Sequence, residues 1–392
     1  MKQALFNLTP DELESFVLGL GQPRFRAKQI AEWLNRGAPD FSVMKNLPEN
    51  LRRDLDATAL TMPCTIVQQL ESADGQTTKF LLELLDGEQI ECVLMRTTYG
   101  NSVCVSSQAG CAMGCKFCAS TLLGLKRNLT ANEMLAQVLT AEWQLRFKAE
   151  GLSAQESHTS NLDSVSHIVV MGTGEPLQNT KALIEFCERA NHDMNIGWRK
   201  ITISTCGIVP GIQELMHWGR PVNLAISLHA PNDLLRSQIM PINNKYPIAE
   251  VLDVAFACAG QHNRQLMVEY IALGRSTRTA TKDKLSSILQ AGSPLAEGCP
   301  QGGVSSGILY NCTPQHAEEL AQLLAGRNCM VNIIPWNTVD ERDFIAPSGN
   351  AIHRFQDILI ANGVHTRIRR ERGTDIGSAC GQLRLNNQNG PK

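Results

Sequence analysis

From residue 100 onward, short apolar runs alternate with longer stretches of helical periodicity, and no other feature constrains the fold as strongly. The expected strands cover residues 103–106, 166–171, 200–205, 222–228, 266–271, 330–334 and 365–368. The expected helices cover residues 130–147, 180–192, 208–218, 247–258, 314–324 and 351–361. This alternation predicts an α/β fold with a parallel sheet and outer helices, in which the loops after the strands bring functional groups to one edge of the sheet.

Three other segments have patterns of their own. Thr9, Pro10 and Glu12 predict a capped helix that begins a helical unit ending near residue 65. Asp86-Gly87 separates two alternating runs and predicts a β-hairpin. The loop-like stretch from about 274 to 313 predicts a surface insertion. The expected organisation is a helical domain at 1–65, a hairpin linker at 66–98, a core at 99–375 with that insertion, and a C-terminal loop and tail at 376–392.

The composition is that of a globular chain in a reducing compartment. No apolar run reaches the length of a membrane span, and the N-terminus leads into a capped helix rather than a signal peptide, which predicts a cytoplasmic protein. The 13 cysteines, an odd number spread over 392 residues, do not resemble a disulfide framework. A formal charge of -2 disfavours non-specific nucleic-acid binding, so an RNA partner would need local basic patches.

Cys111, Cys115 and Cys118 form a C-x3-C-x2-C motif with small residues between the thiols. Three thiols are one ligand short of a structural zinc site. They can bind three irons of a [4Fe–4S] cluster and leave the fourth iron open for a small molecule. Three buried or zinc-binding thiols are the alternative. The C-x3-C-x-aromatic-C pattern resembles the cluster loop of radical S-adenosylmethionine (SAM) enzymes, in which the methionine end of SAM chelates the open iron.

Short polar residues follow the expected strands at the edge where this loop lies. Gly174 lets a backbone come close to a ligand, and Glu175 can accept a hydrogen bond from an ammonium group. Radical SAM enzymes place a similar segment beside the amino group of the cofactor. The other expected contacts to the ribose and carboxylate of SAM are Ser204, Ser227, Leu228, His229 and Asn337. Taken alone, His229 is better explained as a structural histidine.

Several motifs together resemble the RlmN/Cfr family, whose members are radical SAM methyltransferases of RNA adenines. They cover residues 103–111, 128–130, 227–232, 240–243 and 378–383. The resemblance extends from the N-terminal helices to Leu383 and is closest to the RlmN branch. It implies a radical SAM partial (β/α)6 barrel with an N-terminal helical accessory domain and a β-hairpin extension. The chain departs from the family in the insertion, where the family has a short connection.

The resemblance also implies a role for three further residues. Cys380 takes a methyl group from one SAM molecule by displacement, as a thiolate nucleophile does. A second SAM yields a radical that activates this methyl group, which then adds to the adenine. Glu91, an unusual carboxylate in an apolar strand, resembles the base that removes the ring proton. Cys104 resembles the thiol that releases the product by attacking Cys380, which leaves a disulfide. Without the resemblance, Cys104 would be read as a core thiol.

The implied activity is methylation at C2 of an adenine in 23S ribosomal RNA, at the peptidyl-transferase centre, and of the adenine 3′ of the anticodon in tRNAs. The alternative within the family is Cfr-type methylation at C8 of the same ribosomal adenine. The alternative from another class is a non-catalytic iron–sulfur or zinc RNA-binding protein. An electron donor such as flavodoxin with its reductase is the expected partner, and a monomer is the default state. The N-terminal basic residues and Arg367–Arg372 are candidate phosphate contacts, although solvated charges are the commoner case.

Overall fold

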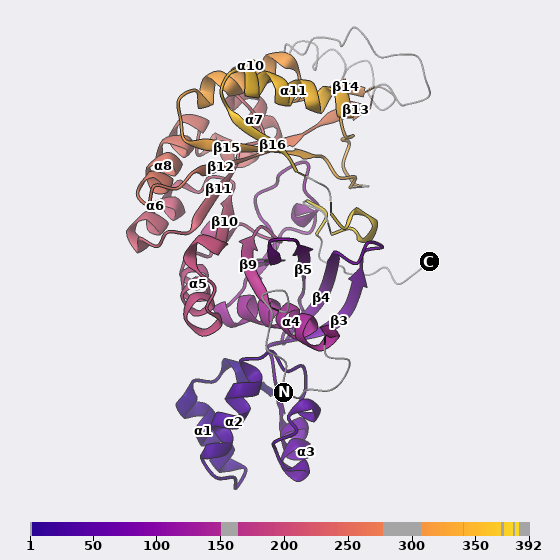
Figure 1. The fold of residues 1–392 in the computed structure, drawn as a ribbon, viewed down its shortest axis with the longest axis vertical. Helices are drawn as coiled ribbons and strands as arrows, with labels where there is room; N and C mark the ends of the chain where they lie inside the picture. Colours follow the sequence, from indigo (N-terminus) through magenta and orange to yellow (C-terminus); the bar gives the residue numbers. More distant parts are fainter. Residues whose placement is uncertain are drawn as a thin grey trace.

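The computed structural model describes residues 2–149, 164–276, 307–339, 341–369, 372–378 and 381–383. Figure 1 shows a small helical body, with the N-terminus beside it, below a larger α/β body. Cys380 and most of the expected insertion, residues 277–306, lie outside the described residues.

The small body consists of three helices: α1 (Pro10–Gly19), α2 (Phe25–Leu34) and α3 (Glu49–Thr58). Helix α1 begins with the expected capping box, because the Thr9 side chain accepts from the Glu12 backbone and the Glu12 side chain accepts from the Thr9 backbone. The three helices share an apolar core made of residues at helical spacing. This core includes Leu13, Val17, Ile30, Leu34, Leu51 and Leu55.

The large body is built on one ten-stranded sheet of order β16-β15-β12-β11-β10-β9-β6-β5-β4-β3. The antiparallel part of the sheet consists of β3 (Cys64–Glu71), β4 (Thr77–Leu84), β5 (Gln89–Thr97) and β6 (Gly100–Cys104), and each strand pairs with the next. The strands that continue parallel to β6 are β9 (Val165–Val170), β10 (Ile201–Thr205), β11 (Asn223–Ser227), β12 (Leu266–Ala272), β15 (Cys329–Pro335) and β16 (His365–Ile368).

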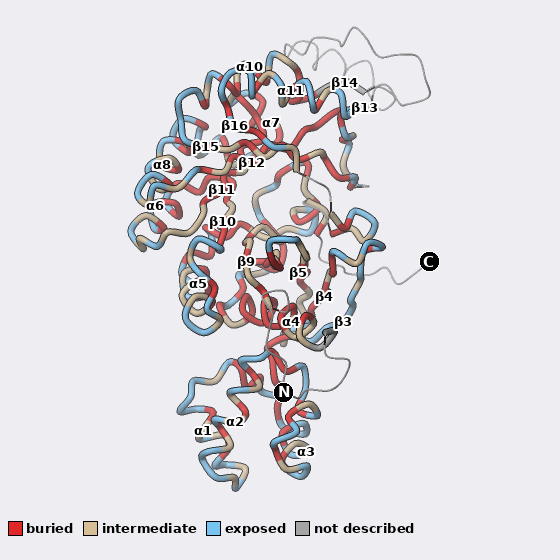
Figure 2. Tube along the Cα trace, viewed as in Figure 1, coloured by how far each residue is buried: buried red, intermediate tan, exposed pale blue. Residues whose placement is uncertain are grey.

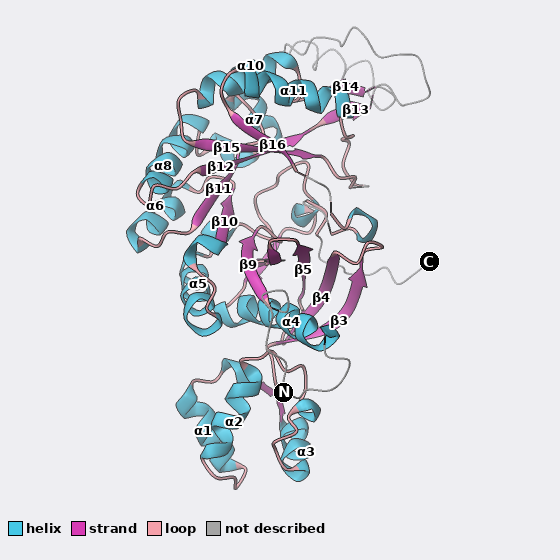
Figure 3. Cartoon of the chain, in the orientation of Figure 1, coloured by secondary structure: helices cyan, strands magenta, loops and turns pink. Residues whose placement is uncertain are grey.

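The helices that follow these parallel strands cover the outer face of the sheet (Figure 3). They are α4 (Ala131–Ala149), α5 (Thr180–Met194), α6 (Val209–Trp218), α7 (Asp233–Ile239), α8 (Ile248–Gly260), α10 (Pro314–Leu324) and α11 (Gly349–Ala361). The central strands are buried while the outer faces of the helices are exposed (Figure 2). The strands after β6 alternate with helices in sequence order, and the partial (β/α)6 barrel is confirmed.

The hairpin around Asp86-Gly87 is present as β4 and β5, with Gly87 at φ 84°. The sequence did not indicate β3, whose side chains are mostly exposed, or the pairing of β5 with β6. The sheet therefore runs without a break across the proposed boundary at residue 98. The domain boundaries themselves stay predictions.

Short elements complete the fold. The pairs are β1 (Gln3–Ala4) with β2 (Ala59–Leu60), β7 (Gln108–Gly110) with β8 (Leu125–Asn128), and β13 (Gly274–Ser276) with β14 (Gly307–Leu309). The single turns of 3-10 helix are η1 (Leu5–Asn7), η2 (Phe41–Val43), η3 (Ala119–Thr121), η4 (Pro176–Gln178), η5 (Trp198–Lys200), η6 (Pro241–Asn244) and η7 (Thr374–Ile376). Across the described residues, no helix combines the length and apolar character needed to span a membrane.

The expectation of a surface insertion is wrong for its last residues, because Tyr310, Cys312 and Thr313 are buried. Asn311 is also buried and holds this segment against the barrel. Its side chain donates to the backbone oxygens of His229 and Ile271, at 2.8 and 2.6 Å. The sequence did not predict this contact, because an asparagine is typical of exposed loops and the sequence does not show that its side chain is buried and hydrogen-bonded.

Candidate active site

The three cysteines of the motif lie on a loop between β7 and β8. Gly110, Gly114 and Gly124 adopt positive φ angles of 77°, 69° and 69°, which side chains disfavour and which let the loop turn sharply. The loop is closed by a bond from the Cys111 backbone N–H to the Gly124 oxygen, at 3.1 Å. It is also tied to the end of α7, where Lys116 N–H donates to Ile239. As a result all three thiols line one pocket at the carboxyl ends of the parallel strands.

The chemistry of this loop fits a cluster held by thiolates. Cys111 and Cys115 are buried, and burial raises the pKa of Cys111 to about 12 and that of Cys115 well above its usual value. A positively charged metal centre would lower the pKa of both thiols, because it binds them as thiolates. Within the described residues, no three His, Cys, Asp or Glu side chains are grouped so as to hold a metal ion. The fit therefore rests on three thiols sharing one pocket.

The lining of this pocket also includes Met171, Gly172, Gly174 and Glu175, which belong to a segment that packs on residues 106–108. The Ser106 hydroxyl accepts from Thr173 N–H at 2.9 Å, and the Gln108 side chain accepts from Glu175 N–H at 2.8 Å. A Cβ added to Gly174, at φ 113°, would lie 2.7 Å from the Gln108 Cβ. The glycine is needed for this backbone contact as well as for access of a ligand.

Glu175 is a buried residue of the pocket lining, and both of its carboxylate oxygens accept hydrogen bonds. Oε1 accepts from Leu177 N–H at 3.0 Å, and Oε2 accepts from Cys206 N–H at 2.7 Å. Burial raises the pKa of Glu175, and the two backbone bonds oppose this rise by stabilising the charged form. Each oxygen keeps capacity for a further donor, so the carboxylate is placed to receive an ammonium group.

Of the other residues expected to contact SAM, Ser204, Ser227 and His229 line this pocket. Burial lowers the pKa of His229 to about 3, so the imidazole is neutral at physiological pH. Its Nδ1 accepts from Ile271 N–H at 3.0 Å, which leaves the ring hydrogen on Nε2. Leu228 is fully buried and does not line the pocket, and Asn337 lines a neighbouring pocket instead.

Sequence reasoning missed Glu269, a buried residue of β12 that lines the same pocket. Its Oε1 accepts from the Asn332 amide at 2.9 Å, while Oε2 has no partner among the described residues. Burial raises the pKa of Glu269, and the charge of Arg369 opposes this rise. A lone carboxylate in an apolar strand was the available signal, the same one that singled out Glu91.

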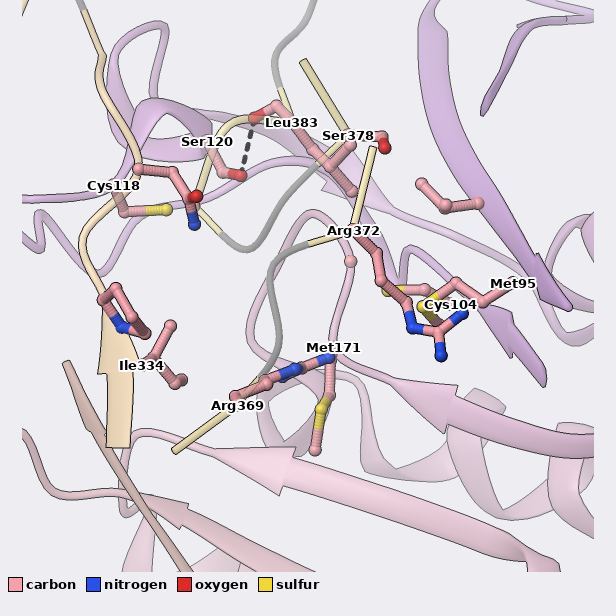
Figure 4. Close-up of a pocket in the computed structure, with 15 residues that line it drawn as sticks. Met95, Cys104, Cys118, Ser120, Met171, Ile334, Arg369, Arg372, Ser378 and Leu383 are labelled. Atoms are coloured by element: carbon pink, nitrogen blue, oxygen red, sulfur yellow. Dashed lines mark hydrogen bonds between the residues drawn. The ribbon is translucent and has the colours of Figure 1, made fainter. Parts of the chain in front are cut away.

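A second pocket adjoins the first and is lined by Cys104 and by residues on both sides of Cys380 in the sequence (Figure 4). Cys380 itself lies outside the described residues. The residues from the C-terminal segment are Ser378, Gly381 and Leu383. The two pockets share Cys118, Ser120, Met171, Gly172, Ile334, Arg369 and Gly381 on their walls. One cysteine of the loop therefore borders both.

Hydrogen bonds anchor the C-terminal segment on both sides of Cys380 in the sequence. Before Cys380, Arg372 Nη1 donates to the Arg96 oxygen, and Asp375 accepts from Ala73 N–H, both at 2.9 Å. After it, the Gly381 oxygen accepts from Ala119 N–H at 2.8 Å. The Leu383 oxygen accepts from the Ser120 hydroxyl at 2.8 Å (Figure 4).

Glu91 lies on β5, two residues before Val93, which lines the second pocket. Its side chain is 2% exposed and forms an ion pair with Lys79 at 3.0 Å. In the basic run Arg367–Arg372, Arg369 and Arg372 line the pocket and Arg367 is exposed. Residues 370 and 371 lie outside the described residues. Only part of this run therefore faces the site.

The fold and this site define a radical SAM protein. The family model of the radical SAM superfamily matches residues 105–268. A crystal structure of a radical SAM methyltransferase from Sphaerobacter thermophilus is similar over 98% of this chain and 100% of that one, with a TM-score of 0.78 and 39% identity. A [4Fe–4S] cluster and SAM are the cofactors that this superfamily implies.

The N-terminal helices narrow the class further. The family model described as the ribosomal RNA large subunit methyltransferase N-terminal domain matches residues 3–60. A probable dual-specificity RNA methyltransferase RlmN from Geobacillus thermodenitrificans is 42% identical over 97% of this chain and 92% of its own. A relative of the same description from Staphylococcus aureus is 41% identical over 98% of this chain and 93% of its own. The chain belongs to the RlmN family of radical SAM RNA methyltransferases.

Proposed function

We propose that this enzyme methylates C2 of an adenine in 23S ribosomal RNA at the peptidyl-transferase centre, and C2 of the adenine 3′ of the anticodon in tRNAs. The proposal is supported by relatives described as dual-specificity RNA methyltransferases over nearly the full chain. Adenine C2 lies between two ring nitrogens and is electron-poor, so it does not attack an electrophilic methyl group. Radical chemistry overcomes this barrier.

In this proposal Cys111, Cys115 and Cys118 hold the cluster, and Gly174, Glu175, Ser204, Ser227 and His229 hold SAM. A cluster and SAM held by these residues would supply the radical chemistry that removes hydrogen from a methyl group. Cys380 carries the methyl group that is activated, so two SAM molecules are used in each turnover. Glu91 takes the ring proton from the resulting protein–RNA adduct, and the adduct's unpaired electron has to leave to a one-electron acceptor, for which a bound cluster would serve. Cys104, as a thiolate, then attacks the sulfur of Cys380. The S–S bond forms, the S–C bond breaks, and the released carbon keeps the electron pair and takes up a proton to become the product methyl group. The disulfide is left for an external reductant.

The observation that carries this proposal is the wall shared by the two pockets. One pocket contains the three thiols and Glu175, and the other contains Cys104 and both flanks of Cys380. A methyl group on Cys380 would have to reach a radical formed in the first pocket and a base on β5, the strand whose Val93 lines the second. Adjoining pockets satisfy both demands.

The RNA must present an unstacked adenine to reach this pocket, since C2 is inaccessible in a stacked helix. Arg369 and Arg372 are placed on the wall of the second pocket, where they can contact the phosphates of a flipped nucleotide. The N-terminal helical unit supplies a second surface for RNA. We further propose that the enzyme acts as a monomer in the cytoplasm, where its RNA substrates are, with a flavodoxin-type electron donor.

The test is anaerobic reconstitution followed by nucleoside analysis of a methylated 23S rRNA fragment and of tRNA. We expect 2-methyladenosine from both, and 8-methyladenosine as the sole product would contradict the proposed position. Cys380→Ala should abolish methylation while iron content is unchanged, whereas a protein that only binds RNA would keep its function. Cys104→Ala should trap a covalent protein–RNA adduct, because the S–C bond cannot then be broken.

A further inference from the structure

We propose that Lys79 is a positioning residue that holds the Glu91 carboxylate ionised and in place, and that links it to the C-terminal segment 372–378. This inference rests on the proposed role of Glu91 as the base. In that step the ring proton passes to a carboxylate oxygen and the C–H electron pair stays in the ring. Lys79 takes no part in this proton transfer.

The register of the sheet brings the two side chains together. Lys79 on β4 pairs with Val93 on β5, and Val93 pairs with Cys104 on β6. Directly paired residues of antiparallel strands point to the same face, as do residues two apart on one strand. Lys79, Glu91, Val93 and Cys104 therefore share the face of the sheet that borders the second pocket. Lys79 and Glu91 are diagonal neighbours on it.

The contact between them is made where water has little access. Lys79 Nζ lies 3.0 Å from Glu91 Oε1, with the two side chains 12% and 2% exposed. A carboxylate buried to this degree is costly to keep charged without a partner. A base must be ionised before it can accept a proton. Lys79 supplies the charge that meets both conditions.

The same ammonium group also contacts the segment that precedes Cys380. Lys79 Nζ donates to the Gly377 oxygen at 3.2 Å, across 298 residues of sequence. Gly377 follows η7 and has a φ angle of 59°, so its carbonyl is presented by a turn. One side chain therefore contacts both the proposed base and the segment that leads to the methyl-carrying cysteine.

Other charged and titratable groups surround this face. Cys104 comes from β6 and Arg372 from segment 372–378, and both line the pocket. Cys92, next to Glu91 on β5, points to the opposite face, where its thiol contacts the Gln137 oxygen. Arg372 is directed by its bond to the Arg96 oxygen. An ion pair joins Lys79 to Glu91, and Arg369 also lines the pocket.

The test is the pH dependence of methyladenosine formation by Lys79→Met, with a 23S rRNA fragment as substrate. Near neutral pH we expect a loss of about 10-fold to 100-fold from the misplaced carboxylate, which is part of the roughly 10²-fold to 10⁴-fold that a general base contributes. The acidic limb of the profile should move to higher pH by about one unit or more, because the charged carboxylate has lost its cation. Iron content and the mass shift for methylation of Cys380 should equal those of the wild type.

Matched variants separate this role from a structural one. Arg327→Met removes a cation from the exposed Arg327–Asp253 ion pair and should leave the pH profile unchanged. Lys79→Arg keeps the charge and should keep the acidic limb at the wild-type pH. If Lys79→Met does not fold, Lys79→Arg still decides, since a shifted limb with the charge retained would overturn the proposal.

Two results would contradict the inference. One is that Lys79→Met forms methyladenosine at the wild-type rate and keeps the acidic limb at the wild-type pH. The other is that its lower rate is caused only by poorer methylation of Cys380. Glu91→Gln and Cys380→Ala are measured in parallel to separate this failure from that of the proposed function. If both of those variants are inactive while Lys79→Met is normal, only the inference fails. If Cys380→Ala still methylates RNA, the proposed function fails.

Discussion

At the scale of single residues, the site depends on two glycines whose backbone lies so close to a neighbouring segment that no side chain would fit between them. Gly172 and Gly174 pack against residues 106–108, and a Cβ on either would lie within 2.7 Å of an atom of that segment. Real Cβ atoms do not come so close, so any substitution must push the wall of the cofactor pocket outward. The glycines of this segment therefore allow it to pack closely on residues 106–108, and they also let a ligand come close to the backbone.

We predict that Gly174→Ala destabilises the fold by about 1 to 3 kcal/mol, because the new Cβ is strained at φ 113° and also clashes. Denaturant unfolding measures this loss, and equilibrium dialysis should show weaker SAM binding. Gly260→Ala is the matched control, since its Cβ would meet nothing within 4 Å at the end of α8. Equal losses for the two variants would contradict the packing role.

At the scale of elements, one buried arginine joins the ends of two strands to a helix. Arg236 on α7 is fully buried. It donates to the backbone oxygens of Leu228, Cys206 and Ser227, at 3.1, 2.7 and 3.2 Å. These oxygens lie just beyond or at the ends of β10 and β11, where strand hydrogen bonding stops. The guanidinium replaces the missing strand partners and fixes the loops that carry Ser227 and His229.

Arg236→Lys should lower the free energy of unfolding by about 3 kcal/mol, since an ammonium group cannot reach all of these carbonyls and buried acceptors would lose their donors. Chemical denaturation of the cluster-free protein measures the change. Arg327→Lys, at an exposed ion pair, is the control and should change stability by less than about 0.5 kcal/mol. A stability loss no larger than that of the control would show that Arg236 does not hold the strand ends.

At the scale of the whole molecule, the helical unit docks on the barrel through a close backbone contact. A Cβ on Gly37, at φ 80°, would lie within 2.4 Å of the Leu139 oxygen on α4. The helical unit and barrel consequently share one continuous apolar core. This contact sets the position of the proposed RNA-binding unit relative to the pockets.

Gly37→Ala is expected to loosen this docking and to increase protease cleavage in the stretch 59–64, which joins the two bodies. RNA affinity should fall while SAM binding is unchanged. Gly21→Ala is a matched control, because Gly21 has a similar φ of 70° but nothing within 4 Å of its Cβ position. If both variants are cleaved equally fast, backbone strain explains the effect and the docking contact does not.

By itself, the sequence determined the order of the barrel elements, the capped first helix, the hairpin turn and the loop of three thiols. These features follow from local periodicity and spacing, which neighbouring residues express directly. Glu91 and Cys104 were singled out from the sequence and lie on one face of the sheet, but their roles stay predictions. The weakly patterned β3 and the seven-residue α7 were missed because short or exposed elements bury too little to leave a periodic signal.

Only the tertiary structure decided which side chains meet. Leu228 and Asn337 follow strands as expected, yet one is buried and the other lines the neighbouring pocket. The contacts of Glu269 with its pocket, of Asn311 with the barrel and of Lys79 with Gly377 join residues distant in sequence. Such contacts depend on sheet register and on how the chain closes over the strand ends. Local patterns contain neither, because both result from the packing of the whole chain.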